Sequence, residues 1–72
     1  MILEEFKKEV LNFANNRPKA WRKGQAVFNY IDEYYRVARN IQFEDGVDCF
    51  YNDDVIDEFI EKAFYKLVSK EN

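Results

Sequence analysis

The sequence predicts a mainly α fold, α+β if its hairpin forms: a compact single domain ordered α-α-ββ-α, with the second helix central. Apolar residues recur at helical spacing in three segments, and those of residues 24–38 fill most of a helical wheel. Residues 39–51 alternate instead, as in strands. The 72 residues, 47% hydrophobic and 35% charged, suit one small soluble core. We therefore expect residues 1–72 to form one domain.

Residues 2–14 are expected to form an amphipathic helix. Its apolar residues at helical spacing define the buried face: Phe6, Val10 and Phe13. Leu11 falls outside this face and is a candidate for exposure or for a contact outside the domain. The pair Asn15-Asn16 predicts the end of the helix, because Asn tolerates the left-handed conformation and Pro18 opposes simple continuation.

The connector of residues 16–23 is basic and contains the only tryptophan. Its candidate nucleic-acid contacts are Arg17, Lys19, Trp21, Arg22 and Lys23. In the alternative interpretation, Trp21 closes one end of the core and the cations are solvated or face the carboxylates of the last third. We favour this structural interpretation, because phosphate binding usually recruits more charge than one short turn supplies.

The helix of residues 24–38 is predicted to be covered from two sides. The middle of its apolar stripe is formed by Val27, Ile31, Tyr34 and Ala38. Only a narrow polar back remains, formed by Asn29, Asp32, Glu33 and Arg36. Gln25 and Asn29 lie one turn apart, and we expect this structural polar pair to hydrogen-bond a neighbouring backbone such as residues 48–52.

Residues 39–51 predict a short β-hairpin with an Asp45-Gly46 turn. A two-residue turn would place Asp48 on the buried face, so we favour a three-residue loop, 44–46, with Gly46 left-handed. This register pairs apolar residues on one face: Phe43 with Val47 and Ile41 with Cys49. An isolated hairpin is marginally stable, so this one is expected to lie against the helices.

The last helix is expected to begin after residues 52–54, whose short polar side chains can cap its free amides. Its buried stripe is formed by Val55, Ile56, Phe59, Ile60, Ala63 and Leu67. Residues 69–72 are expected to fray.

Residues that carry chemistry are scarce. The chain has no histidine, the commonest general base and metal ligand. The acidic residues of the last third lack the spacing of a calcium loop: Asp45, Asp48, Asp53, Asp54 and Asp57. The single cysteine, Cys49, cannot form an internal disulfide and is interpreted as a small buried hydrophobe. We predict no catalytic residue, metal ligand or cofactor, and no enzyme activity.

Composition also bears on location. No apolar run approaches the roughly 20 residues of a membrane span, and the first three residues are followed at once by Glu4 and Glu5, unlike a signal peptide. We therefore expect a cytoplasmic protein without membrane contact. Its net charge of −3 combines a basic first part with an acidic last third.

Two segments resemble a known family. The run Trp21–Asn29 (WRKGQAVFN) and the downstream run Asp48–Asp53 (DCFYND) resemble motifs in a family of short uncharacterised proteins encoded by bacteriophages and prophages. The family has an acid where this chain has Asn52, and a different connector over residues 36–45. The resemblance implies a phage-related bacterial setting but no activity, substrate or site.

Together these features predict a small interaction module whose partner is another protein, of phage or host. The alternative function is a nucleic-acid-binding accessory domain that uses the basic connector 17–23. A contiguous exposed aromatic patch would favour the first function, and a continuous basic face would favour the second. The sequence leaves the oligomeric state open.

Overall fold

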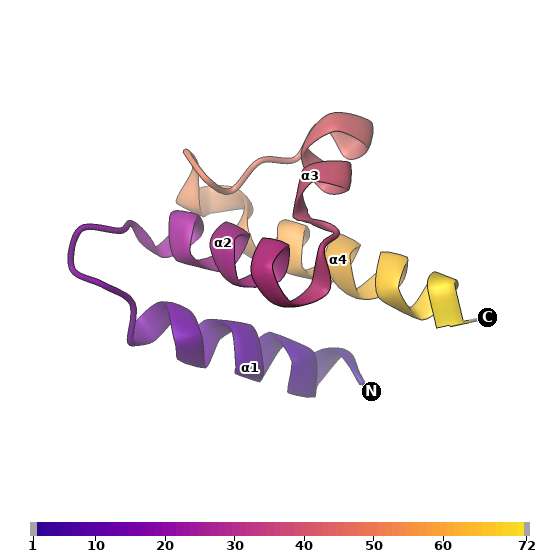
Figure 1. The fold of residues 1–72 in the computed structure, drawn as a ribbon, viewed down its shortest axis with the longest axis horizontal. Helices are drawn as coiled ribbons and strands as arrows, with labels where there is room; N and C mark the ends of the chain where they lie inside the picture. The colour runs from indigo at the N-terminus through magenta and orange to yellow at the C-terminus, as the bar shows by residue number, and fades with distance from the viewer. Residues whose placement is uncertain (1, 72) are drawn as a thin grey trace.

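The computed structural model describes the backbone of residues 2–71 and the side chains of residues 2–69. Its longer helices are α1 (Leu3–Asn15), α2 (Lys23–Tyr35) and α4 (Ile56–Glu71). The shorter elements are α3 (Ala38–Asn40), the π-helical turn η1 (Ile41–Asp45) and the 3-10 turn η2 (Asp53–Val55). The prediction of a mainly helical domain is confirmed (Figure 1).

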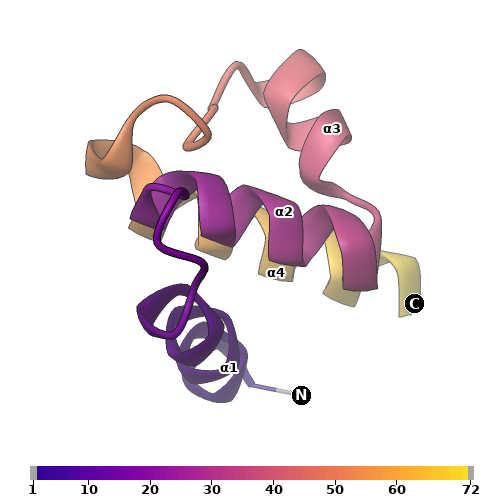
Figure 2. The same cartoon turned by 60° about the vertical axis from the view of Figure 1, so that its left-hand side comes forward.

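Helix α2 occupies the middle of the fold. It packs against α1, α3 and α4, while α1 and α4 also contact each other. Figures 1 and 2 show α1 and the α3–η1 segment on opposite sides of α2. The residues of α2 that are buried are Gly24, Ala26, Val27, Phe28 and Ile31. Covering from several sides explains why this helix is apolar around most of its circumference.

The core is a single cluster of apolar side chains from every helix. Its largest fully buried members are Phe6, Phe59, Ile31, Ile41 and Ile60. The predicted faces of α1 and α4 contribute Phe6, Val10, Ile56, Phe59, Ile60 and Ala63 to this cluster, as expected from the helical period of 3.6 residues. Val37, which no predicted stripe included, is also fully buried.

Helix α1 differs from expectation at two positions. Leu11 is partly buried and packs against the core, although it falls outside the predicted face. Asn16 ends the helix with a negative φ of −109°, so the expected left-handed conformation is absent. Its side-chain amide instead donates a 2.8 Å hydrogen bond to the carbonyl oxygen of Asn12. Other free carbonyl groups of the last turn accept from the backbone amides of Asn16 and Arg17, and none of these bonds requires a left-handed residue.

Helix α2 ends at Tyr35, three residues earlier than predicted. Arg36 adopts a left-handed conformation, with a φ of 60°, and its amide donates to the carbonyl oxygen of Ile31. This turn changes the direction of the chain. Val37, which precedes α3, and Ala38, the first residue of α3, are therefore buried in the core. The expected single helix over residues 24–38 is therefore two helices separated by a sharp turn.

The predicted β-hairpin is wrong. Residues 38–45 are helical, and no strand occurs within residues 2–71. Ile41 is buried in η1, but Phe43, expected on the same face, is 81% exposed. The predicted α-α-ββ-α topology is therefore replaced by four helices and two short turns.

The second half of the predicted hairpin is an irregular extended segment. Val47 and Cys49 point into the core, as the alternation indicated, but they have no partner strand. Gly46 is left-handed as predicted, with a φ of 68°, but it ends η1 rather than turning a hairpin. Alternation thus predicted the burial of Val47 and Cys49 correctly, but it predicted neither the exposure of Phe43 nor the absence of a partner strand.

The last helix follows the predicted stripe. The side chain of Asn52 accepts a hydrogen bond from the amide of Asp54, 2.9 Å away, at the start of η2. Helix α4 extends through Glu71; the predicted fraying of residues 69–72 remains a prediction, and residue 72 lies outside the described residues. Within the described part of the chain, no helix has the length and apolar character needed to cross a membrane.

Candidate functional site

The two segments of the resemblance meet at the start of α2. The backbone amide of Gly24 donates a 2.9 Å hydrogen bond to a carboxylate oxygen of Asp53. The Sγ of buried Cys49 donates to the carbonyl oxygen of Gly24, 3.2 Å away. A Cβ atom at position 24 would lie 2.0 Å from the backbone oxygen of Cys49, so only glycine allows this approach. We interpret the junction as structural, because its polar groups bond one another.

The predicted polar pair lies beside this junction. Gln25 and Asn29 are both half-buried. The hydrogen bonds that join the segment of residues 48–53 to α2 use Gly24, one residue before Gln25. The structural role of the Gln25 and Asn29 side chains therefore stays a prediction.

The candidate nucleic-acid contacts on the connector differ in their surroundings. Arg17 donates from Nε to the carbonyl oxygen of Trp21, at 2.8 Å, and from Nη1 to that of Ala14, at 2.9 Å. Lys19 and Arg22 are exposed, whereas Lys23 is half-buried. The guanidinium of Arg17 thus holds the connector against the end of α1. This cation of the connector therefore has a structural role.

Trp21 is half-buried and packs against the core. It also lines a groove where α1, the connector and α2 meet. The groove has a volume of about 320 Å³ and is lined by Phe13, Trp21, Asn29, Tyr30, Asp32, Glu33 and Tyr34. We call this site the aromatic groove. It joins residues that are up to 21 positions apart in the sequence.

Three rings of the aromatic groove, those of Phe13, Tyr30 and Tyr34, form a continuous row. The ring centroid of Tyr30 lies 4.8 Å from that of Phe13 on one side and 4.8 Å from that of Tyr34 on the other. Tyr34 is 66% exposed, so the row continues from the edge of the core to solvent. Aromatic contacts at these separations add stability beyond burial alone. The groove therefore offers rigid aromatic surface to a ligand.

A shared carboxylate holds one wall of the groove. The hydroxyls of Tyr30 and Tyr35 both donate to the same oxygen of Glu9, the first at 2.7 Å. Burial, followed by the hydrogen bond to Glu9, raises the pKa of Tyr30 above its ordinary value and that of Tyr35 to about 12. Both tyrosines are therefore neutral donors at physiological pH.

The charged residues that line the aromatic groove are both acidic. Asp32 forms an ion pair with Arg39, whose Nε lies 3.6 Å from its carboxylate. Glu33 is exposed, and within the described side chains of residues 2–69 it forms no ion pair. The site thus combines aromatic faces with negative charge. Such a lining suits a peptide side chain and opposes a phosphate.

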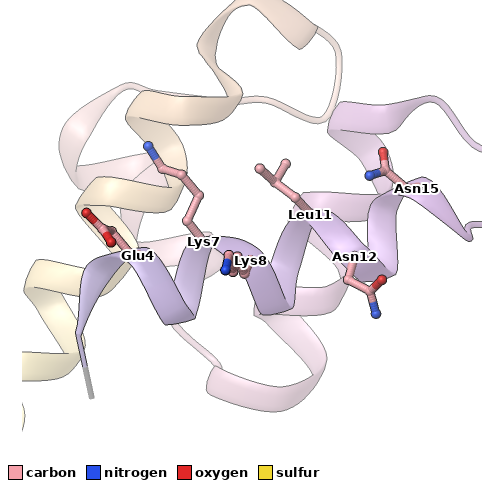
Figure 3. Close-up of a pocket in the computed structure, with 6 residues that line it drawn as sticks. All are labelled: Glu4, Lys7, Lys8, Leu11, Asn12 and Asn15. Atoms are coloured by element: carbon pink, nitrogen blue, oxygen red, sulfur yellow. The ribbon is translucent and has the colours of Figure 1, made fainter.

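A second, larger hollow lies along α1. It has a volume of about 680 Å³ and is lined by Glu4, Lys7, Lys8, Leu11, Asn12 and Asn15. Figure 3 shows that all six come from α1, with Lys7 and Leu11 extending to the same side of the helix. Leu11 is the only apolar residue in this lining. The Nζ of Lys7 forms an ion pair with Oε1 of Glu61 on α4, 3.9 Å away. This shelf is open and formed by a single helix, so it encloses less of a ligand than the aromatic groove does.

Other exposed aromatic residues are scattered over different elements. Phe43 lies on η1, Tyr51 on the irregular segment and Tyr65 on α4. Among the described residues, no three potential ligands of the histidine, cysteine, aspartate or glutamate type lie close enough to hold a metal ion. The aromatic groove is consequently the best-formed candidate site.

The aromatic groove could be read from the sequence only in part. The sequence predicts Phe13 and Tyr34 on apolar faces, Asp32 and Glu33 on the polar back of the second helix, and Trp21 in the connector. An aromatic content of 18% was the available signal that more rings were present than a small core needs. Which rings would share one groove depends on how α1 crosses α2.

Comparison of the chain with known protein families, with curated proteins and with solved structures finds no match. The proposals below therefore rest on the geometry and chemistry of this chain.

Proposed function

We propose that this protein is a small interaction module that binds another protein through the aromatic groove. The single observation behind the proposal is the continuous row of rings that ends in the largely exposed Tyr34. Tyrosine and tryptophan dominate binding energy at protein interfaces, because they offer large contact area at small conformational cost. On the resemblance noted above, we propose a phage-related setting in the bacterial cytoplasm.

Electrostatics support a protein partner over a nucleic acid. A strand stacked on Trp21 would meet Asp32 and Glu33, which line the same groove. Like charges in contact disfavour the complex. Arg17, one of the connector cations, is already engaged by two backbone carbonyl groups.

A peptide selection tests this proposal. The full-length protein is treated with nuclease, immobilised and used to enrich binders from a library of random short peptides. Tyr34→Ser is the test variant, because Tyr34 is exposed and its loss leaves the core intact. Tyr65→Ser is the matched control, since Tyr65 is 61% exposed but lies on α4, outside the groove.

We expect enriched peptides to bind wild type and Tyr65→Ser equally, and Tyr34→Ser at least about tenfold more weakly. Equal binding to all three proteins would place the contact elsewhere and overturn the proposal. So would a failure to enrich any peptide, combined with quenching of Trp21 fluorescence by single-stranded DNA or RNA at low salt.

A further inference from the structure

We infer that the aromatic groove recognises an arginine side chain of its partner. This inference rests on the proposed function and adds the chemistry of the recognised group. Three features carry it: the faces of the lining rings, the two carboxylates among them, and a guanidinium of the chain itself that already approaches one of those carboxylates.

The rings supply the first part of the recognition. The face of an aromatic ring carries partial negative charge, and Trp and Tyr attract cations most strongly. The groove is lined by Trp21, Tyr30 and Tyr34, with Phe13 closing the inner end. The hydroxyl of Tyr30 is fixed by Glu9, which holds this ring in place before a ligand arrives. A preformed surface of this kind lowers the entropic cost of binding.

The carboxylates supply the second part. Asp32 and Glu33 are the charged residues among those lining the groove, and they also line a neighbouring hollow together with Arg36 and Arg39. Arg39 places its Nε 3.6 Å from Asp32 in an exposed ion pair, which contributes little to stability. This pair shows that a guanidinium can approach Asp32, although Arg39 itself lies outside the lining of the groove. Glu33, exposed on the same lining, is positioned to receive a guanidinium from another chain.

Arginine fits this groove better than lysine for geometric reasons. Its planar guanidinium stacks on a ring while its edge donates to carboxylates, which a compact ammonium cannot do at once. The side-chain carbonyl oxygen of Asn29, half-buried in the same lining, is a further acceptor for the five guanidinium donors. Stacking, ion pairing and hydrogen bonding are therefore all available to one side chain.

A pair of isosteric peptides tests the inference directly. Acetyl-Gly-Ser-Arg-Ser-Gly-amide is titrated into the full-length protein, and the same peptide with citrulline in place of arginine serves as the neutral isostere. Trp21 is the only tryptophan and lines the groove, so its fluorescence reports on binding there. Ionic strength is held constant, because salt screens exposed charges.

We expect a saturable change in Trp21 fluorescence with the arginine peptide, at a Kd on the order of 1 mM for a single anchoring side chain. The citrulline peptide should bind at least about tenfold more weakly, because it lacks the charge that both rings and carboxylates attract. Equal responses to the two peptides, or no response to either up to about 10 mM, would overturn the inference.

The variant Glu33→Gln tests whether the preference for the charged peptide arises from a carboxylate in the groove. This variant should weaken binding of the arginine peptide about threefold to tenfold and leave citrulline binding unchanged. Glu58→Gln is the matched control, because Glu58 is also an exposed helical carboxylate but lies on α4, outside the groove. An equal loss in both variants would indicate general electrostatic attraction rather than recognition in the groove, and would contradict the inference.

The two proposals fail in different ways. If peptides selected on the groove depend on Tyr34 but contain no arginine and tolerate Glu33→Gln, the interaction function stands and the arginine inference is wrong. If the arginine peptide binds as expected but the library yields no Tyr34-dependent binder, the chemistry of the groove stands and the proposed polypeptide partner is wrong.

Discussion

The amide of Gly24 donates a 2.9 Å hydrogen bond to the carboxylate of Asp53, although 29 positions separate the two residues. Arg22, which precedes α2, provides no side-chain cap for this helix. Asp53 therefore satisfies a free amide at the start of α2 from the η2 turn, and it places negative charge at the positive end of the helix dipole. One carboxylate thus joins the last third of the chain to the central helix.

Gly24→Ala is expected to destabilise the fold by about 3 kcal/mol, because the new Cβ would lie 2.0 Å from the backbone oxygen of Cys49 and backbone must move. Gly46→Ala is the control. Gly46 has open space around it but a φ of 68°, so its substitution should cost only about 1 kcal/mol of strain. Urea denaturation measures both values, and equal effects would contradict the close approach.

Asp53→Ala removes the side-chain cap without removing apolar contacts of the core. We expect the free energy of unfolding to fall by about 1 kcal/mol, as for other helix caps. Asp54→Ala is the matched control, because the bond that Asp54 makes to Asn52 comes from its backbone amide and survives the substitution. A thermal melt that ranks Asp54→Ala as the more damaging variant would refute the capping role.

The tyrosine pair predicts a loss of stability at alkaline pH. Burial and the shared Glu9 raise the pKa of Tyr35 from 10.0 to about 12 and raise that of Tyr30 as well. Because the folded state favours the protonated hydroxyls, their contribution is full below about pH 10 and is lost as the pH rises towards 12. Denaturant unfolding across this range should show a declining free energy of unfolding.

Glu9→Gln separates this effect from other alkaline changes. The amide oxygen still accepts hydrogen bonds, but the negative charge that disfavours tyrosinate is gone. The decline above pH 10 should therefore be shallower in the variant. Spectrophotometric titration of the tyrosinate absorbance should show that the last ionisations occur at lower pH than in wild type. Identical titration curves would exclude the role of Glu9.

Cys49 should resist alkylation in the folded protein. Burial, together with the charge of Asp48, raises the pKa of its thiol to about 12, so little thiolate forms and the sulfur is inaccessible. Iodoacetamide labelling at mildly alkaline pH should be at least about 100-fold slower than in urea. Gly24→Ala, which disturbs the same contact, should accelerate labelling. Rapid labelling of the wild type would contradict the packed position of Cys49.

Helical periodicity predicted the parts of the fold that depend on burial along one helix. Phe6 and Val10 in α1, and Phe59, Ile60 and Ala63 in α4, are all buried as their spacing indicated. The burial of these residues can be predicted from their spacing in the sequence, because an α-helix repeats every 3.6 residues whatever it packs against.

The region between α2 and α4 could not be predicted in the same way. Phe43 and Ile41 alternate as in a strand, yet they lie on one helical turn with opposite exposure. Their backbone follows from the left-handed turn at Arg36, and Arg is a residue type with no special preference for that conformation. A short alternating run does not distinguish a paired strand from a turn followed by an extended segment, because no local signal specifies a pairing partner.

The candidate site, like the fold, could be predicted from the sequence only in part. The basic residues around Trp21 suggest a nucleic-acid contact. In the folded chain, however, the Trp21 ring lines the same groove as Asp32 and Glu33 of α2. Asp32 and Glu33 were predicted on the polar back of α2, but Tyr34, predicted in the middle of the buried stripe, is 66% exposed beside them. The position of these residues next to Phe13 depends on the packing of α1 against α2. Sites assembled from several elements require tertiary structure, even where each contributing residue is conspicuous in the sequence.

The position of the Gly24 amide has a consequence for hydrogen exchange. Amides in the first turn of a helix usually exchange with solvent quickly, since they have no partner within the helix. The Gly24 amide is bonded to Asp53 and covered by the segment that contains Cys49, so it exchanges only when that segment lifts from α2. Its protection factor therefore reports how often the segment of residues 49–53 detaches from the start of α2.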